Sequence, residues 1–140
     1  MKTKTLIFIL SVIACKTEID PTSIVGKWEN TRIVQRKDSV GIWSKWKATI
    51  NPGFGFTTNT LYQFTWDGRF FRDNKPGVLA CRSGNRYVVS NNKITFSERD
   101  PIEARINCID CSNWEIVEIK DDTLVLQECP GTRNKFVRIR

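Results

Sequence analysis

The sequence predicts an all-β fold, an antiparallel, up-and-down β-barrel of eight strands. About eight short runs of β-branched and aromatic residues are separated by turn-forming residues such as Asp-Gly, Asn-Asn and Pro-Gly. No segment has the periodicity of an amphipathic helix of useful length, so parallel strands would lack helical crossovers. Closing eight antiparallel strands into a barrel would also remove the exposed sheet edges that invite aggregation.

The first strand is expected in the stretch "IVGKWENTRIV", residues 24–34. The two-residue period of a strand places Ile24, Gly26 and Trp28 on one face. Gly26 would let a ring or backbone approach closely where the strand bends. Trp28 would point to the same side and close the base of the barrel.

The next hairpin is expected at residues 61–71, where Asp67-Gly68 provides the turn. One face of its first strand carries the aromatic residues Tyr62, Phe64 and Trp66. The preceding stretch, residues 37–60, is harder to interpret. It holds a strand or hairpin around residues 40–49, and then a loop whose Phe54 and Phe56 would cap a barrel mouth or fold back on the core.

The remaining strands follow as hairpins. Asn91-Asn92 tolerates the positive φ values of a two-residue turn. A three-residue turn is expected at residues 120–122, between the strands 113–119 and 123–128. The strands joined in this way are 86–90, 93–97, 113–119, 123–128 and, after Pro130-Gly131, 134–140.

The amino-terminal segment is typical of an export signal. Lys2 and Lys4 precede an apolar run, residues 6–14, that is too short to span a bilayer comfortably as a helix. The sequence "VIAC" that ends this run resembles the bacterial lipobox, in which the cysteine is acylated, with palmitate among the chains, before cleavage. We therefore expect a signal peptide at 1–14, lipid on Cys15, a tether at 15–22 and a barrel domain at 23–140. An ordinary cleaved signal and a buried helix are the alternatives.

Charge and composition exclude several classes of function. Without Lys2 and Lys4 the chain has 20 basic and 15 acidic side chains, and no basic run exceeds two residues. Such scattered charge suits a solvated surface near an anionic membrane, so no nucleic-acid partner is expected. The absence of histidine removes the usual general base and the commonest metal ligand. We expect no enzyme, no cofactor and no metal site, and a monomer.

Four cysteines besides Cys15 suit two disulfides in an exported chain. A three-residue turn at 120–122 would place Ile119 opposite Thr123, and hence Asn113 opposite Cys129, with Cys111 one diagonal step away. A two-residue turn at 91–92 would bring Cys81 near the loop that holds Cys108. The preferred pairing is Cys81 with Cys108 and Cys111 with Cys129. The exchanged pairing, a zinc site and a redox-active C-x-x-C remain as alternatives.

Gly26-Lys27-Trp28, placed in the first strand just after a lipobox, is similar to the G-x-W motif of lipocalins. The hairpins "LYQFTWDGRFF", "RYVVSNNKITF" and "WEIVEIKDDTLVLQ" and the last strand "NKFVRIR" look like the small lipocalin-like lipoproteins of Bacteroidetes envelopes. The resemblance covers residues 24–140. It implies a late arginine packed on Trp28, and Arg138 is the candidate, with Arg140 on the same strand face.

The resemblance implies a barrel that binds or carries a small hydrophobic molecule. Arg86 or Arg138 would then meet a ligand carboxylate. The side chains expected to line the site are Tyr62, Phe64, Trp66, Phe70, Phe96, Trp114 and Arg86. The alternative is an interaction protein with a filled barrel, such as an enzyme inhibitor or a subunit of an envelope complex. Lys16 after the lipidated cysteine favours the outer membrane, facing the periplasm or the cell surface.

Overall fold

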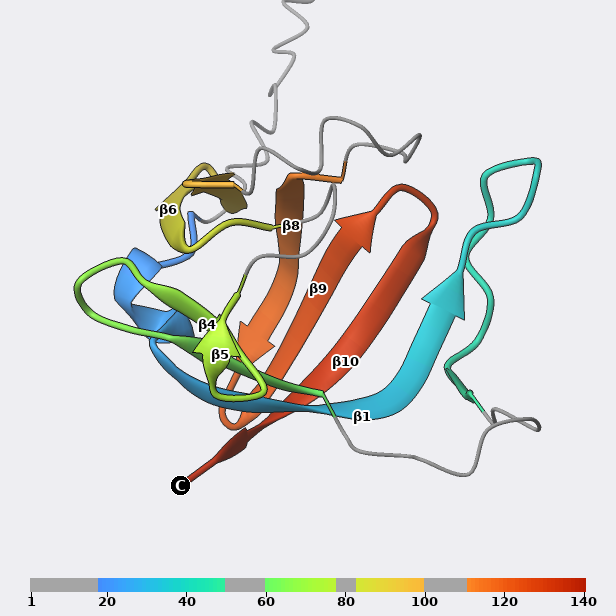
Figure 1. The fold of residues 1–140 in the computed structure, drawn as a ribbon. Helices are drawn as coiled ribbons and strands as arrows, with labels where there is room; N and C mark the ends of the chain where they lie inside the picture. Colours follow the sequence, from blue (N-terminus) through green and yellow to red (C-terminus); the bar gives the residue numbers. More distant parts are fainter. Residues whose placement is uncertain (1–17, 50–59, 78–82, 100–110) are drawn as a thin grey trace, which may run out of the picture.

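Ten β-strands and one short 3-10 helix form the fold in the computed structural model, which describes residues 18–49, 60–77, 83–99 and 111–140 (Figure 1). The elements are η1 (Pro21–Ile24), β1 (Gly26–Arg36), β2 (Lys47–Ala48), β3 (Leu61–Phe64), β4 (Phe70–Arg72), β5 (Lys75–Pro76), β6 (Arg86–Ser90), β7 (Lys93–Ser97), β8 (Asn113–Lys120), β9 (Thr123–Cys129) and β10 (Thr132–Ile139). The expected lipid site at Cys15, the aromatic loop with Phe54 and Phe56, and the Cys81–Cys108 pair lie outside the described residues. None of the described helices is long and apolar enough to cross a membrane.

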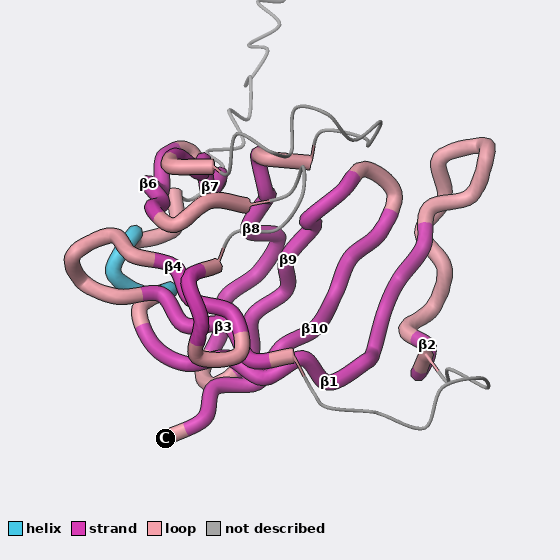
Figure 2. The backbone as a smooth tube through the Cα atoms, viewed as in Figure 1, coloured by secondary structure: helices cyan, strands magenta, loops and turns pink. Residues whose placement is uncertain are grey.

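The strands are arranged in sequence order around the sheet, and every pairing is antiparallel (Figure 2). β1 pairs with β10 on one side and with β3 on the other. The amide of Phe70 donates to the carbonyl of Asn85 over 2.8 Å, and the amide of Tyr87 donates to the carbonyl of Gly68 over 2.9 Å. These bonds join the start of β4 to β6, so eight strands form a ring. The predicted all-β, antiparallel, up-and-down barrel is confirmed, and β2 and β5 are additional strands outside the ring.

The β6–β7 hairpin has the predicted turn, and the β8–β9 hairpin has a shorter turn than predicted. Asn91 and Asn92 have φ values of 51° and 59° and join Ser90 to Lys93, as predicted. The β8–β9 turn has two residues instead of the expected three, because Asp121 adopts a φ of 52° and Lys120 pairs with Thr123. A bulge in β8 between Ile116 and Glu118 then shifts the register back by one residue. Two local differences therefore cancel before the strands reach the cysteines.

The cysteine pair at the end of this hairpin is bonded. Cys111 and Cys129 form a disulfide with a Cα–Cα distance of 5.0 Å, which confirms the preferred partner of Cys129. The bond joins the start of β8 to the end of β9, 18 residues apart. It holds together the end of this hairpin that lies away from the Asp121-Asp122 turn.

Packing against the barrel begins earlier than the expected boundary at residue 23. Ile19 packs against the hydrophobic core, and its amide donates to Asn92 Oδ1 over 2.7 Å. Asp20 caps η1 by accepting from the amide of Thr22 at 2.9 Å, and Ile24 at the end of η1 is fully buried. Residues 19–22, assigned to the tether from the sequence, are thus in contact with the barrel.

Trp66 does not join the interior face with Tyr62 and Phe64. β3 ends at Phe64, and the amide of Arg69 donates to the Thr65 hydroxyl over 3.0 Å across the turn that follows. Trp66 lies in this turn and is 77% exposed. The alternation expected from the sequence therefore stops two residues before Trp66.

β1 is longer than its pairing with β3 requires, and its second half pairs with β10 and no longer with β3. The strand has a register shift between Asn30 and Ile33, where Arg32 adopts a φ of 61°. Beyond this bulge, Ile33 and Val34 pair with β2 instead of β3. We call residues 33–48 the arm; it includes the projecting cyan hairpin of Figure 1.

Candidate functional site

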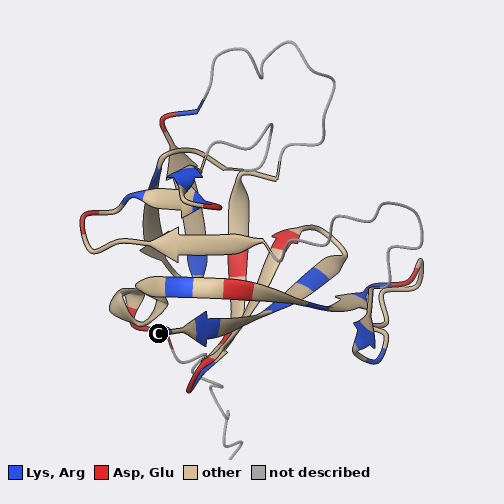
Figure 3. Cartoon of the chain, turned by 60° about the horizontal axis from the view of Figure 1, so that its bottom comes forward, with Lys and Arg blue, Asp and Glu red and all other residues tan. Residues whose placement is uncertain are grey.

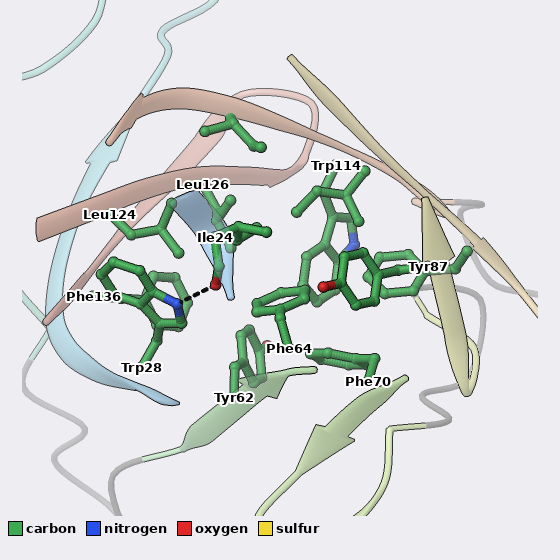
Figure 4. Close-up of a cluster of buried hydrophobic side chains, with 13 residues drawn as sticks. Ile24, Trp28, Tyr62, Phe64, Phe70, Tyr87, Trp114, Leu124, Leu126 and Phe136 are labelled. Carbon is green, nitrogen blue, oxygen red and sulfur yellow. Dashed lines mark hydrogen bonds between the residues drawn. The ribbon is translucent and has the colours of Figure 1, made fainter. Parts of the chain in front are cut away.

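The interior of the barrel is the first candidate site, and aromatic rings fill it (Figure 4). Tyr62 is central: its ring centroid lies 5.3 Å from that of Phe70, 5.4 Å from that of Trp114 and 5.0 Å from that of Phe136. Phe96 packs edge to face on Trp114 at 4.6 Å. These are the separations and angles of favourable aromatic contacts, so the rings act as a close-packed core.

Five of the seven residues expected to line a ligand site belong to this core. They are Tyr62, Phe64, Phe70, Phe96 and Trp114, each no more than 5% exposed. The other two, Trp66 and Arg86, lie on the surface.

Arg86 stabilises the junction between β4 and β6. Its Nε lies 3.0 Å from Glu98 Oε1, and its Nη1 donates to the carbonyl of Asp67 over 3.2 Å. The guanidinium is therefore engaged by groups of the chain itself. It lies beside the two backbone bonds that close the barrel, where a surface hollow of about 260 Å³ adjoins Phe70, Asn85 and Arg86.

One polar group inside the ring core lacks a partner. Trp114 is fully buried, and in the part of the chain that the structure describes its Nε1–H donates to no acceptor. A buried donor that makes no hydrogen bond costs about 1 to 3 kcal/mol of stability. The group could donate to a carbonyl or hydroxyl oxygen of a small molecule, if one displaced part of the core.

The base of the barrel is built around Trp28. Its Nε1 donates to the carbonyl of Ile24 over 2.7 Å, and the guanidinium carbon of Arg138 lies 4.1 Å from its ring centroid. Arg138 also donates to the carbonyls of Val25 and Ser23 over 2.7 and 2.8 Å. The side chain implied by the lipocalin resemblance thus joins the entry of the chain to the last strand.

Gly26 is required by the same contact. Its φ is +141°, a conformation that L-residues rarely adopt, and a Cβ at this position would lie 2.4 Å from Nη1 of Arg138. The glycine therefore provides the space in which the arginine reaches the backbone of Val25. Its role in the fold is structural.

The arm carries a second set of cation–aromatic contacts, which the sequence analysis missed. The Arg133 guanidinium carbon lies 3.9 Å from the Trp43 ring centroid, and Lys135 Nζ lies 5.9 Å from that of Trp46. Val40 and Ile42 at the arm's tip are 77% and 65% exposed. Figure 3 shows several Lys and Arg positions in this part of the chain. The W-x-x-W spacing in "IWSKWK" is the signal that could have indicated an aromatic face.

Tyr87 and Asp67, near the junction between β4 and β6, have shifted pKa values. Burial raises the pKa of Tyr87 to about 12, with a contribution from the nearby Asp67 carboxylate, and the phenol donates to the carbonyl of Thr65 over 2.8 Å. The Thr65 hydroxyl and the guanidinium groups of Arg69 and Arg86 lower the pKa of Asp67. Across the described ranges, no three acidic or cysteine side chains are placed together to hold a metal ion.

Comparisons with known proteins give two distant structural matches. No family model and no curated protein matches the sequence. A solved lipocalin-like protein from Bacteroides uniformis ATCC 8492 shares 15% identity and a TM-score of 0.45, covering 84% of this chain and 99% of that one. An uncharacterized protein from Bacteroides eggerthii DSM 20697 shares 17% identity and a TM-score of 0.39, covering 83% and 99%.

Proposed function

We propose that this lipocalin-like chain is a lipid-anchored, non-enzymatic binding protein of the bacterial envelope that acts through its surface, with a filled barrel. The observation that carries the proposal is the ring core. Tyr62, for example, has three aromatic neighbours whose centroids lie between 5.0 and 5.4 Å away. A carrier would need to move several of these rings to admit even a small molecule, and each displaced ring loses its packing.

The surface offers a better binding region than the core. On the arm, Val40, Ile42 and Trp46 are exposed. Arg133 and Lys135 of β10 contact the tryptophan rings of the arm. Aromatic and arginine side chains are the residue types that contribute most to protein interfaces. The arm is therefore the surface that we assign to a partner protein.

The anchor follows from the lipobox-like "VIAC" and the charged and apolar segment before it. Growth of cells with an alkyne analogue of palmitate should label the full chain, and Cys15→Ala should abolish the label. Fractionation of the same cells should place the wild-type chain in the outer membrane. A chain that is released in soluble form, with no label, would contradict the anchor.

The filled interior is tested with cis-parinaric acid, whose fluorescence rises when it enters an apolar cavity. We expect no saturable increase with the wild-type chain. Phe64→Ala is the matched variant, because it removes a ring that packs on Phe70 and Tyr87 at 4.9 and 5.0 Å and so opens space in the same core. Stoichiometric uptake by the wild-type chain would refute the filled barrel.

Carriage of a small hydrophobic molecule is the second candidate function. The unpartnered Nε1–H of Trp114 favours it, because a polar group in an apolar pocket is how such sites orient a ligand. If this function is correct, the wild-type chain takes up the probe and Trp114→Phe, which keeps a ring and removes the donor, binds a carbonyl-bearing probe more weakly. The two functions thus make opposite predictions for the same titration.

A further inference from the structure

An exposed apolar patch lies beside the first residues of the barrel. Trp66 is 77% exposed and Val88 is 66% exposed, and both border a shallow surface hollow of about 270 Å³. Pro21, Thr22 and Val25 of the amino-terminal segment line the same hollow. We call these five residues the Trp66 patch. It brings together η1, the β3–β4 turn and the outer face of β6.

The chain that enters the barrel is fixed next to this patch. The amide of Ile19 donates to Asn92 Oδ1 over 2.7 Å, and the amide of Asn91 donates to Glu18 Oε1 over 3.4 Å. Asn91 and Asn92 form the turn at the end of β6, the strand that carries Val88. The entry point and the patch therefore share one hairpin.

The length of the tether limits how far this part of the barrel can lie from the membrane. Ile19 lies four positions after Cys15, and four steps of fully extended chain span about 14 Å. A lipid on Cys15 fixes that residue at the bilayer surface. The hairpin that holds Ile19 must then lie within the same distance of the lipid headgroups.

We propose that the Trp66 patch docks on the surface of the bilayer that holds the lipid anchor, with the Trp66 ring among the headgroups. The inference rests on the proposed anchor at Cys15. Tryptophan prefers the membrane–water interface, because its ring is apolar and its indole N–H is polar. Docking would orient the barrel, in addition to holding it near the membrane.

The charges beside the patch indicate that the bilayer on which it docks has zwitterionic lipid headgroups. Arg69 Nε lies 3.0 Å from Asp67 Oδ2, and Arg86 Nε lies 3.0 Å from Glu98 Oε1, so cations here are balanced by carboxylates. Burial of apolar side chains then supplies the attraction between the patch and the bilayer. A bilayer whose headgroups carry no net charge, such as phosphatidylcholine, is sufficient for this attraction. Docking should therefore change little with salt, unlike binding by a cationic patch to anionic lipid.

The test uses the full acylated chain, reconstituted at one copy per nanodisc of phosphatidylcholine with bromine on its acyl chains. Bromine quenches tryptophans that reach the bilayer. We expect Trp66→Ser to remove roughly half or more of this quenching, since an interfacial ring is the one at quenching depth. Trp46→Ser is the matched control: Trp46 is an exposed tryptophan of the arm, and its removal should leave the quenching unchanged, as should 0.5 M salt.

Each alternative outcome is distinct. Equal quenching in the Trp66→Ser variant and the wild-type chain, with intact mass confirming acylation, overturns the docking and leaves the anchor in place. Protection of Trp66 from acrylamide that appears only at two or more copies per disc identifies a second copy as the occupant, and also overturns it. An intact mass without acyl groups refutes the anchor itself, and with it the docking.

Discussion

Among the described residues, two tryptophan–arginine stacks occur, one at the base of the barrel and one between β10 and the arm. The guanidinium carbon lies 4.1 Å from the ring centroid for Arg138 and Trp28, and 3.9 Å for Arg133 and Trp43. The distances are nearly equal. The surroundings differ, and they determine what each stack does for the protein.

At the base, every polar group of the stack that reaches the interior has a partner. Trp28 is fully buried and donates to Ile24, and Arg138 donates to two carbonyls of the entering chain. On the arm, Trp43 is only partly buried, and Arg133 Nε has no hydrogen-bond partner within the described part of the chain. Burial and completed hydrogen bonds, more than stacking distance, therefore distinguish a contact that determines the fold from a surface contact.

The largest effect is expected for Trp28→Ala. Removal of a fully buried ring leaves a cavity and an unsatisfied carbonyl at Ile24, so the free energy of unfolding should fall by about 3 to 5 kcal/mol. Urea denaturation followed by circular dichroism measures it. Trp43→Ala is the matched variant, and a loss as large as that of Trp28→Ala would break the distinction between the two stacks.

Arg138→Ala should be next in size. The change removes two charge-assisted hydrogen bonds to Ser23 and Val25 as well as the stack on Trp28, which predicts a loss of roughly 2 to 3 kcal/mol. Arg138→Lys tests the geometry, because an ammonium cannot reproduce the planar fork of a guanidinium. Full stability in the lysine variant would show that charge alone suffices.

Gly26→Ala probes the space that the base stack needs. A methyl group would meet Arg138 Nη1 and hold a non-glycine residue at a φ of +141°, so we expect a loss of about 1 to 3 kcal/mol. In the double variant with Arg138→Ala the clash disappears and the φ strain remains. A double-mutant cycle in urea should therefore show coupling, and strict additivity would contradict the steric role.

The smallest effect is expected for Arg133→Ala, which removes the β10 partner of the arm's Trp43. The stack on Trp43 is partly solvated, so its loss should cost less than about 1 kcal/mol. Thermal denaturation of the variant beside Arg138→Ala makes the comparison direct. Destabilisation by Arg133→Ala equal to that by Arg138→Ala would mean that the arm is part of the folding core.

Most strands and turns of the barrel can be predicted from the sequence, because strand periodicity and turn residues are local signals. Asn91-Asn92 predicts its turn correctly, since asparagine tolerates the left-handed conformation. The Cys111–Cys129 bond is predicted although the β8–β9 turn is one residue shorter than expected, because the bulge at Ile116 compensates. Bulges depend on how strands fit in three dimensions, and no local residue type specifies this one.

The candidate site is less predictable from the sequence, because it too depends on how the strands and their side chains fit in three dimensions. The expected ligand residues of β3, β4, β7 and β8 do lie inside the barrel, but whether rings leave a cavity depends on how their volumes add up across strands. Trp66 has the same residue type as the interior tryptophans and lies outside, because the strand ends before it. The sequence predicts a strand or hairpin around residues 40–49, where the structure has β2, but it does not predict the pairing of β2 with β1. At Arg32, β1 changes partner from β3 to β2, which only the folded sheet determines.

Native mass spectrometry of the chain purified from its own source, without denaturant, tests the central claim most directly. A filled barrel that acts through its surface predicts the mass of the acylated polypeptide alone, and the same mass under denaturing conditions. An additional species bound one to one in the native spectrum, lost on denaturation and weakened by Trp114→Phe, would contradict that account and establish a carrier.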